Sequence, residues 1–98
     1  MNKYLLKLYI TGQTSKSEQA IVNMRRICEE NFKKKYKLII IDILERPQLA
    51  ENERIIATPT LVKELPLPLR RIIGDLSDKE KVLLGLDVQP CSGFKEGE

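Results

Sequence analysis

The sequence contains no histidine and no tryptophan, and only two of its 98 residues are cysteine. The absence of histidine removes the most common general base, the most common metal ligand and the usual pH-sensitive side chain. Zinc would need clustered cysteines or carboxylates, and no such spacing occurs. The phosphate-binding motifs GxxxxGKS/T and GxGxxG are also missing. We therefore expect no enzymatic activity, no cofactor and no bound metal.

The two cysteines do not form a CxxC pair, and two cysteines are too few for a disulfide framework. Cys28 falls at helical spacing among apolar residues, which indicates a small hydrophobic core residue. Cys91 lies in the stretch "CSGFKEGE", which is small and polar and is typical of a flexible tail. We expect one domain over residues 1–90 and a tail over residues 91–98.

The sequence has neither a large net charge nor a long apolar run. The net charge is +3, from 17 basic and 14 acidic residues, and the one basic cluster is Lys33–Lys35 with Lys37 nearby. Tyr36 alone lies between its lysines, so the aromatics do not interleave with this cluster as in a base-stacking platform, and a helix end is favoured over a nucleic-acid site. The longest apolar run, residues 38–41, is far shorter than the ~20 residues of a membrane span. The amino terminus "MNKYLLKLYITG" lacks the pattern of a signal peptide. We expect a cytoplasmic protein with no nucleic-acid or membrane partner.

The first half of the sequence predicts a strand, a helix and a second strand. Residues 4–10 are rich in apolar and aromatic side chains, and Gly12 follows them closely. Residues 38–44 form a second predicted apolar strand. Between them, Ser15-Lys16-Ser17-Glu18 is typical of a capping box. The helix that follows has this predicted core face: Ala20, Ile21, Met24, Ile27, Cys28 and Phe32. This βαβ spacing predicts two parallel strands. Asp42, inside the second strand, is expected to anchor a strand end.

The opposite face of the predicted helix carries a polar stripe, and two interpretations of it remain open. It could be an ordinary solvated face or a binding face. Its members are Lys16, Gln19, Asn23, Arg26 and Glu30.

The second half of the sequence gives conflicting local signals. Pro47 suits the first turn of a short helix over residues 47–56. Residues 60–63 and 69–73 could be two strands joined by a turn at Pro66 and Pro68, or either proline could open a helix. Neither alternative is favoured.

The last predicted helix starts at Ser77-Asp78-Lys79-Glu80, a second capping box. Gly85 could end this helix as a left-handed residue, followed by a short strand over residues 86–88. Alternatively, the helix could run through Gly85 and stop before Pro90.

Residues 57–62, "ATPTLV", resemble the proline turn that faces the CxxC pair in thioredoxin-like proteins, but the corresponding CxxC position holds "GQTSKS". Longer stretches resemble the KaiB family, small clock proteins of cyanobacteria that also occur in other bacteria. The matching stretches are "LKLYITG", "IDILERPQLAE" and "IIATPTLVKELPLPLRRIIGDLSDKEKVLLGLD". The resemblance covers nearly the whole chain.

The resemblance implies an α/β thioredoxin-like domain that can take two folds. The family's ground state has the order βαββααβ and forms tetramers, whereas the other state is a thioredoxin-like βαβαββα monomer. The amino-terminal half is common to both. We expect five residues to govern this fold switch: Pro59, Pro66, Pro68, Gly85 and Asp87.

The resemblance also implies a non-enzymatic regulatory protein. It would bind a KaiC-type hexameric ATPase, and KaiA and histidine kinases are further expected partners, in a circadian clock or a related stress response. A homo-oligomer, tetramer or dimer, is expected in the ground state. We expect the partner-binding residues to be Lys16, Gln19, Asn23 and Arg26. The alternative is a thioredoxin-like thiol enzyme or adaptor that uses Cys28 or Cys91.

Overall fold

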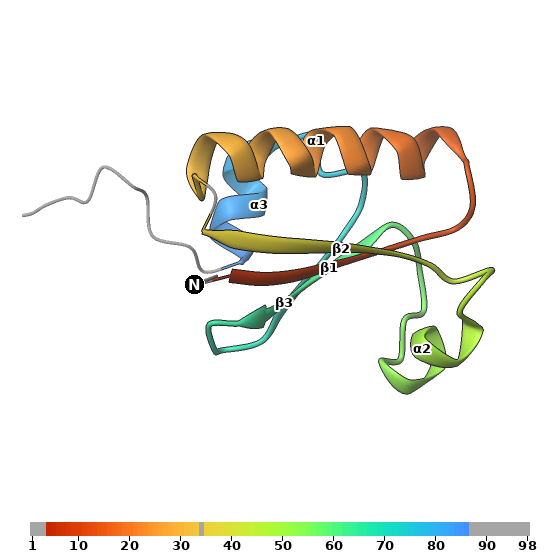
Figure 1. Ribbon diagram of the computed structural model, residues 1–98. Coiled ribbons are helices and arrows are strands. Elements are labelled where there is room, and N and C mark those ends of the chain that lie inside the picture. Colours follow the sequence, from red (N-terminus) through yellow and green to blue (C-terminus); the bar gives the residue numbers. More distant parts are fainter. Residues whose placement is uncertain (1–3, 34, 87–98) are drawn as a thin grey trace, which may run out of the picture.

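The computed structural model describes residues 4–33 and 35–86. Along the chain the elements are β1 (Tyr4–Ile10), α1 (Ser15–Asn31), β2 (Tyr36–Asp42), α2 (Pro47–Asn52), β3 (Thr60–Leu65), β4 (Arg70–Ile73) and α3 (Lys79–Gly85) (Figure 1). This is the thioredoxin-like order βαβαββα, one of the two orders expected from the resemblance. The ambiguous second half therefore forms two strands, and the alternative of a helix opened at Pro66 or Pro68 is wrong for this structure.

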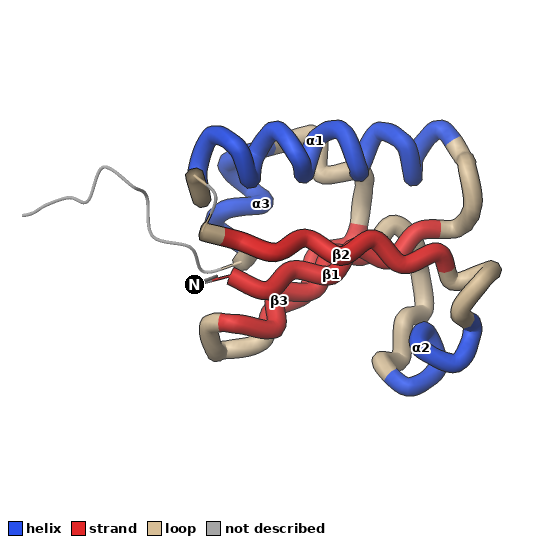
Figure 2. Tube along the Cα trace, in the orientation of Figure 1, coloured by secondary structure: helices blue, strands red, loops and turns tan. Residues whose placement is uncertain are grey.

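The four strands form one sheet in the order β2-β1-β3-β4. Strands β1 and β2 are parallel, as the βαβ spacing predicts, and Tyr4 pairs with Tyr36 at one end of their ladder. The pairs β1–β3 and β3–β4 are antiparallel. Helices α1 and α3 lie over one face of the sheet, and the short α2 lies on the other side (Figures 1 and 2).

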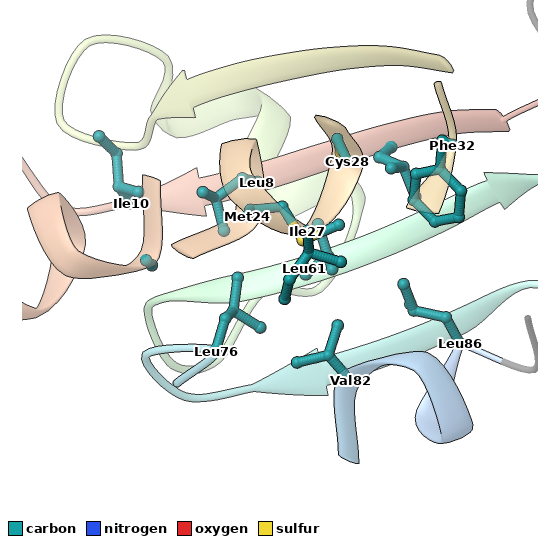
Figure 3. Packing of buried hydrophobic residues seen from close by; sticks show 12 residues of the cluster. Leu8, Ile10, Met24, Ile27, Cys28, Phe32, Leu61, Leu76, Val82 and Leu86 are labelled. Carbon is teal, nitrogen blue, oxygen red and sulfur yellow. The ribbon is translucent and has the colours of Figure 1, made fainter. Parts of the chain in front are cut away.

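The main core lies between the sheet and the helices α1 and α3 (Figure 3). It includes five of the six residues predicted on the core face of the first helix, namely Ala20, Met24, Ile27, Cys28 and Phe32, while Ile21 packs against this core and is partly buried. A smaller cluster on the opposite sheet face contains Tyr9, Ile41 and Val62, against which Leu49 of α2 packs. Because both faces of the sheet are covered where these clusters lie, strands β1 and β3 are buried on both sides.

Both predicted helix starts are displaced by one residue. Thr14, not Ser15, caps α1, and its Oγ1 accepts from the Ser17 N–H at 3.2 Å. Asp78, not Ser77, caps α3, and its Oδ1 accepts from the Lys81 N–H at 3.2 Å. Consecutive residues of capping type cannot be separated from sequence, because each has a side-chain oxygen that can accept the same kind of bond.

Helix α2 ends at Asn52, before the predicted end at residue 56. Arg54 takes a left-handed conformation with φ of 56°. The Arg54 N–H donates to the Glu51 carbonyl at 3.1 Å, and the Ile55 N–H donates to the Ala50 carbonyl at 2.9 Å. This is the bonding pattern of a Schellman motif, which satisfies the last carbonyls of the helix and stops it.

Helix α3 runs through Gly85, so the alternative in which a left-handed Gly85 ends the helix does not apply to this arrangement. Leu86 is the carboxy-terminal cap. The expected strand over residues 86–88, the extension towards Pro90 and the predicted tail involve residues 87–98, which lie outside the described part of the chain. Among the described helices, none is long and apolar enough to cross a membrane.

Candidate functional site

The position that holds the redox pair in thioredoxins is occupied here by hydroxyl groups. The loop after β1 approaches the turn before β3, where Thr11 Oγ1 and Thr58 Oγ1 share a short hydrogen bond. Ser17 Oγ accepts from the Thr11 N–H at 3.2 Å and from Thr14 Oγ1 at 2.9 Å. These contacts join the start of α1 to the turn at Pro59. Hydroxyls at this place cannot perform thiol–disulfide exchange, which needs a thiolate.

Cys28 lies inside the core and has no accessible surface. Burial, with a smaller contribution from the Glu29 carboxylate and a small opposing one from Arg25, raises the pKa of its thiol to about 12. A thiol with this pKa is protonated at neutral pH, so it is not a nucleophile. This confirms Cys28 as a core residue and removes it from the thiol alternative. Cys91 lies outside the described residues.

Asp42 anchors the end of β2, as predicted. Its Oδ1 accepts from the Gly12 N–H at 3.0 Å and from the Leu44 N–H at 2.9 Å. Gly12 has a positive φ of 57°, a conformation that glycine adopts without steric cost. Asp42 therefore fixes the turn from which α1 starts, and thereby the position of the helix relative to the sheet.

The four predicted partner-binding residues lie on the outer face of α1. Lys16, Gln19 and Arg26 are exposed, whereas Asn23 is partly buried. Val22, which is 62% exposed, lies on the same face and was not predicted. Together with Ser15, Glu18, Gln19 and Asn23 it lines a shallow hollow. The only sequence signal for Val22 is an apolar residue on the polar side of an amphipathic helix.

Asn23 is partly buried because it reaches the second half of the chain. Its Nδ2 donates to the main-chain carbonyl of Asp75, between β4 and α3, at 2.9 Å. Its Oδ1 accepts from Arg26 Nη2 at 3.4 Å. Farther along α1, Glu30 Oε1 and Lys79 Nζ are 3.5 Å apart. Sequence reasoning missed these contacts because they join residues far apart in the chain.

The residues expected to govern the fold switch do not form one site. Pro59 is buried directly before β3, whereas Pro66 and Pro68 are exposed in the connection from β3 to β4, at the other end of that strand. The peptide bonds that precede all three prolines are cis. Gly85 lies at the end of α3. Asp87 lies outside the described residues.

No cluster of three or more potential metal ligands occurs within residues 4–33 and 35–86. The described residues instead form a helix face with exposed basic, amide and apolar groups on an α/β frame. Such a face can form contacts with another macromolecule.

The class of protein is thioredoxin-like. The chain superposes on mitochondrial thioredoxin 3 from Saccharomyces cerevisiae with a TM-score of 0.70 and 17% identity, over 89% of this chain and 79% of the thioredoxin, a likeness of fold alone. It also superposes on the N-terminal domain of SasA from Synechococcus elongatus with a TM-score of 0.72 and 25% identity, over 97% of this chain and 91% of that domain.

The chain belongs to the KaiB family. The KaiB domain model matches residues 7–88. The circadian clock protein KaiB3 of Synechocystis sp. is 59% identical over 92% of this chain and 88% of its own length. The circadian clock oscillator protein KaiB of Synechococcus elongatus is 58% identical over 87% of this chain and 83% of its own length. This family membership favours a regulatory clock-type function over a thioredoxin-like thiol enzyme.

Proposed function

We propose that this chain is a non-enzymatic regulatory protein that binds a KaiC-type hexameric ATPase and modulates its ATPase activity and phosphorylation state. The setting would be a circadian clock or a related stress response, in the cytoplasm. One observation carries this proposal: the chain keeps the thioredoxin-like frame of its family but has hydroxyls at the redox position and an exposed polar face on α1. That combination suits binding and does not suit electron transfer.

The proposed contact surface is the outer face of α1, comprising Lys16, Gln19, Asn23 and Arg26. The charged groups on it would steer association with an acidic patch on the ATPase. KaiA and histidine kinases are proposed as further partners. The likeness of fold to the N-terminal domain of SasA supports a binding surface that this chain shares with that domain, because two domains of one shape can occupy one surface.

A homo-oligomeric ground state, tetramer or dimer, is part of the proposal. Large apolar side chains are exposed in the second half of the chain, with Leu67 75% and Leu84 83% accessible. Exposed apolar surface of this kind is typical of protein contact sites. The proposed exchange between the oligomer and the thioredoxin-like monomer would be governed by Pro59, Pro66, Pro68, Gly85 and Asp87. Light scattering at tens of micromolar protein tests this, since a strictly monomeric mass would contradict it.

The experiment that tests the proposed surface is charge reversal on α1. We expect Arg26→Glu to slow association with a purified KaiC-type ATPase and to weaken binding about 10-fold, since a repulsive charge replaces an attractive one. Biolayer interferometry measures both quantities. The matched control is Arg46→Glu, which makes the same charge change at the start of α2, on the other side of the sheet. Equal binding by the Arg26→Glu variant and the unaltered protein would place the contact elsewhere.

The thiol alternative is tested separately by the double variant Cys28→Ser/Cys91→Ser. We expect ATPase binding and regulation to be unchanged in this variant. Loss of regulation with the fold intact, as shown by circular dichroism, would favour a thiol-dependent adaptor.

A further inference from the structure

The side chain of Asn23 connects two parts of the molecule, α1 and the segment between β4 and α3. It belongs to α1, it donates to the Asp75 carbonyl at 2.9 Å, and it accepts from Arg26 at 3.4 Å. An amide group can do both at once, because its nitrogen donates and its oxygen accepts. The orientation of the Arg26 guanidinium is thus linked to the position of the segment between β4 and α3.

That segment forms one border of the outer face of α1. Asn23 lines the shallow hollow on α1, and Asp75 lines a second hollow together with Ser77, Asp78 and Lys81. The hydrogen bond between Asn23 and Asp75 links a residue that lines one hollow to a residue that lines the other. The ion pair of Lys79 with Glu30 adds a second link, but both side chains are about half exposed, so its contribution is small.

The two sides of this surface differ in charge. The α1 side presents Lys16 and Arg26, which are exposed cations. The other side presents Asp75 and Asp78, whose carboxylates accept from the Ser77 N–H at 3.1 Å and the Lys81 N–H at 3.2 Å. These main-chain bonds fix the acidic groups in place. A partner that fits both sides must present acidic groups to α1 and basic groups or hydrogen-bond donors to the segment.

We propose that the binding surface is composite, made of the outer face of α1 and residues 74–78, and that Asn23 is its positioning residue. This inference rests on the proposed function, and the occupant it assigns is the KaiC-type ATPase. Asn23 holds Arg26 in its bonded orientation while residues 74–78 lie against α1. When these residues move away, the Asn23 amide loses its acceptor and no longer holds Arg26 in one orientation. The entropic cost of ordering Arg26 then falls on the binding step and weakens affinity. The surface is therefore complete only in this arrangement of the second half.

The test compares two substitutions at one position. Asn23→Ala removes both hydrogen bonds, and we expect the Kd for the purified ATPase to rise about 3- to 10-fold. Asn23→Asp keeps an acceptor for Arg26 and strengthens that bond, but a carboxylate cannot donate to the Asp75 carbonyl. If Asn23 works through residues 74–78, Asn23→Asp weakens binding at least as much as Asn23→Ala. Gln48→Ala is the control, because it removes the amide hydrogen bonds to Glu51 and Asn52 on α2, on the other side of the sheet (Figure 1).

A double-mutant cycle separates positioning from direct contact. In an Arg26→Ala background we expect Asn23→Ala to weaken binding less than it does when Arg26 is present, because one of the two groups that Asn23 positions is gone. Hydrogen exchange of the unbound protein provides a readout without the ATPase: the main-chain amide of Ser77 should exchange faster in Asn23→Ala than in Gln48→Ala.

Failure of the inference and failure of the proposed function give different results. If Arg26→Glu weakens binding but Asn23→Asp binds as tightly as the unaltered protein, the composite surface is refuted while the α1 site stands. If Arg26→Glu binds normally, the α1 site itself is refuted, and the composite surface with it. Circular dichroism of each variant confirms that the fold is retained.

Discussion

Gly85 packs so closely against Ile72 that an added methyl group would collide with it. A Cβ built on Gly85 would lie 2.9 Å from Cδ1 and 3.1 Å from Cγ1 of Ile72. Alanine is better than glycine in a helix by about 1 kcal/mol, which from sequence alone favours Gly85→Ala as a stabilising change. The contact opposes that gain, because Ile72 must leave its preferred rotamer at a cost of about 0.5–1.5 kcal/mol. We therefore expect Gly85→Ala alone to change the free energy of unfolding by less than about 0.5 kcal/mol.

The helix gain should reappear when the obstructing atom is removed. Ile72→Val deletes Cδ1 and leaves the 3.1 Å contact, which small movements can relieve. We expect Ile72→Val by itself to lower the free energy of unfolding by about 0.5–1.5 kcal/mol. In that background we expect Gly85→Ala to raise the free energy of unfolding by about 0.5–1 kcal/mol. Urea unfolding of the four proteins, followed by circular dichroism, measures the coupling between the two sites.

Additive free energies would refute this reasoning, since they would show that Ile72 does not restrain residue 85. The result also bears on the proposed fold switch. A left-handed Gly85 in one fold and a helical Gly85 in the other would together let Gly85→Ala favour the thioredoxin-like state by about 1–2 kcal/mol, partly through the helix gain. The contact with Ile72 reduces that part, so the shift should be smaller than predicted unless Ile72 is also changed.

Three further predictions concern buried or anchoring groups. Lys63 is 1% exposed and has no hydrogen-bond or ion-pair partner among the described residues. Because burying an unpaired polar group is costly, Lys63→Met should raise the free energy of unfolding by about 1–3 kcal/mol. A lower urea midpoint would contradict this. In a Cys91→Ser background, the buried Cys28 should react with iodoacetamide at pH 8 at least about 100-fold more slowly in the folded protein than in urea, and equal rates would show an accessible thiol. Asp42→Ala should cost about 1–3 kcal/mol by leaving the Gly12 and Leu44 N–H groups unpaired, whereas Asp42→Asn, which keeps one acceptor oxygen, should cost less in the same unfolding assay.

Local patterns were sufficient wherever a side chain's role depends on its near neighbours. The apolar repeat from Ala20 to Phe32 predicted the buried face of α1, because helix geometry brings residues three and four apart to the same side. Asp42 was identified as a strand-end anchor, since a carboxylate at such a place readily accepts main-chain bonds. The lack of a CxxC pair at the redox position was evident because no cysteine occurs between Gly12 and Ser17. Family membership was also evident from the sequence stretches themselves.

Local patterns failed where two conformations satisfy the same local preferences. The segment around Pro66 and Pro68 is compatible with a turn between strands or with a helix start, because proline excludes only a helix interior. Pairing of β3 with both β1 and β4 decided between them, and those hydrogen bonds join residues distant in sequence. Gly85 was equally ambiguous, since glycine tolerates both helical and left-handed conformations.

The sequence by itself determined the family, the strand–helix–strand first half and the polar stripe on α1. Only the tertiary structure showed that Asn23 of this stripe bonds to the main chain of Asp75, and that Ile72 packs closely against Gly85. The physical reason is that periodicity reports which residues share a face of one element, whereas contacts between elements depend on how the whole chain packs. The amide of Asn23 is an ordinary polar group in the sequence, and its role as a link between the two halves exists only because folding places the Asp75 carbonyl 2.9 Å away.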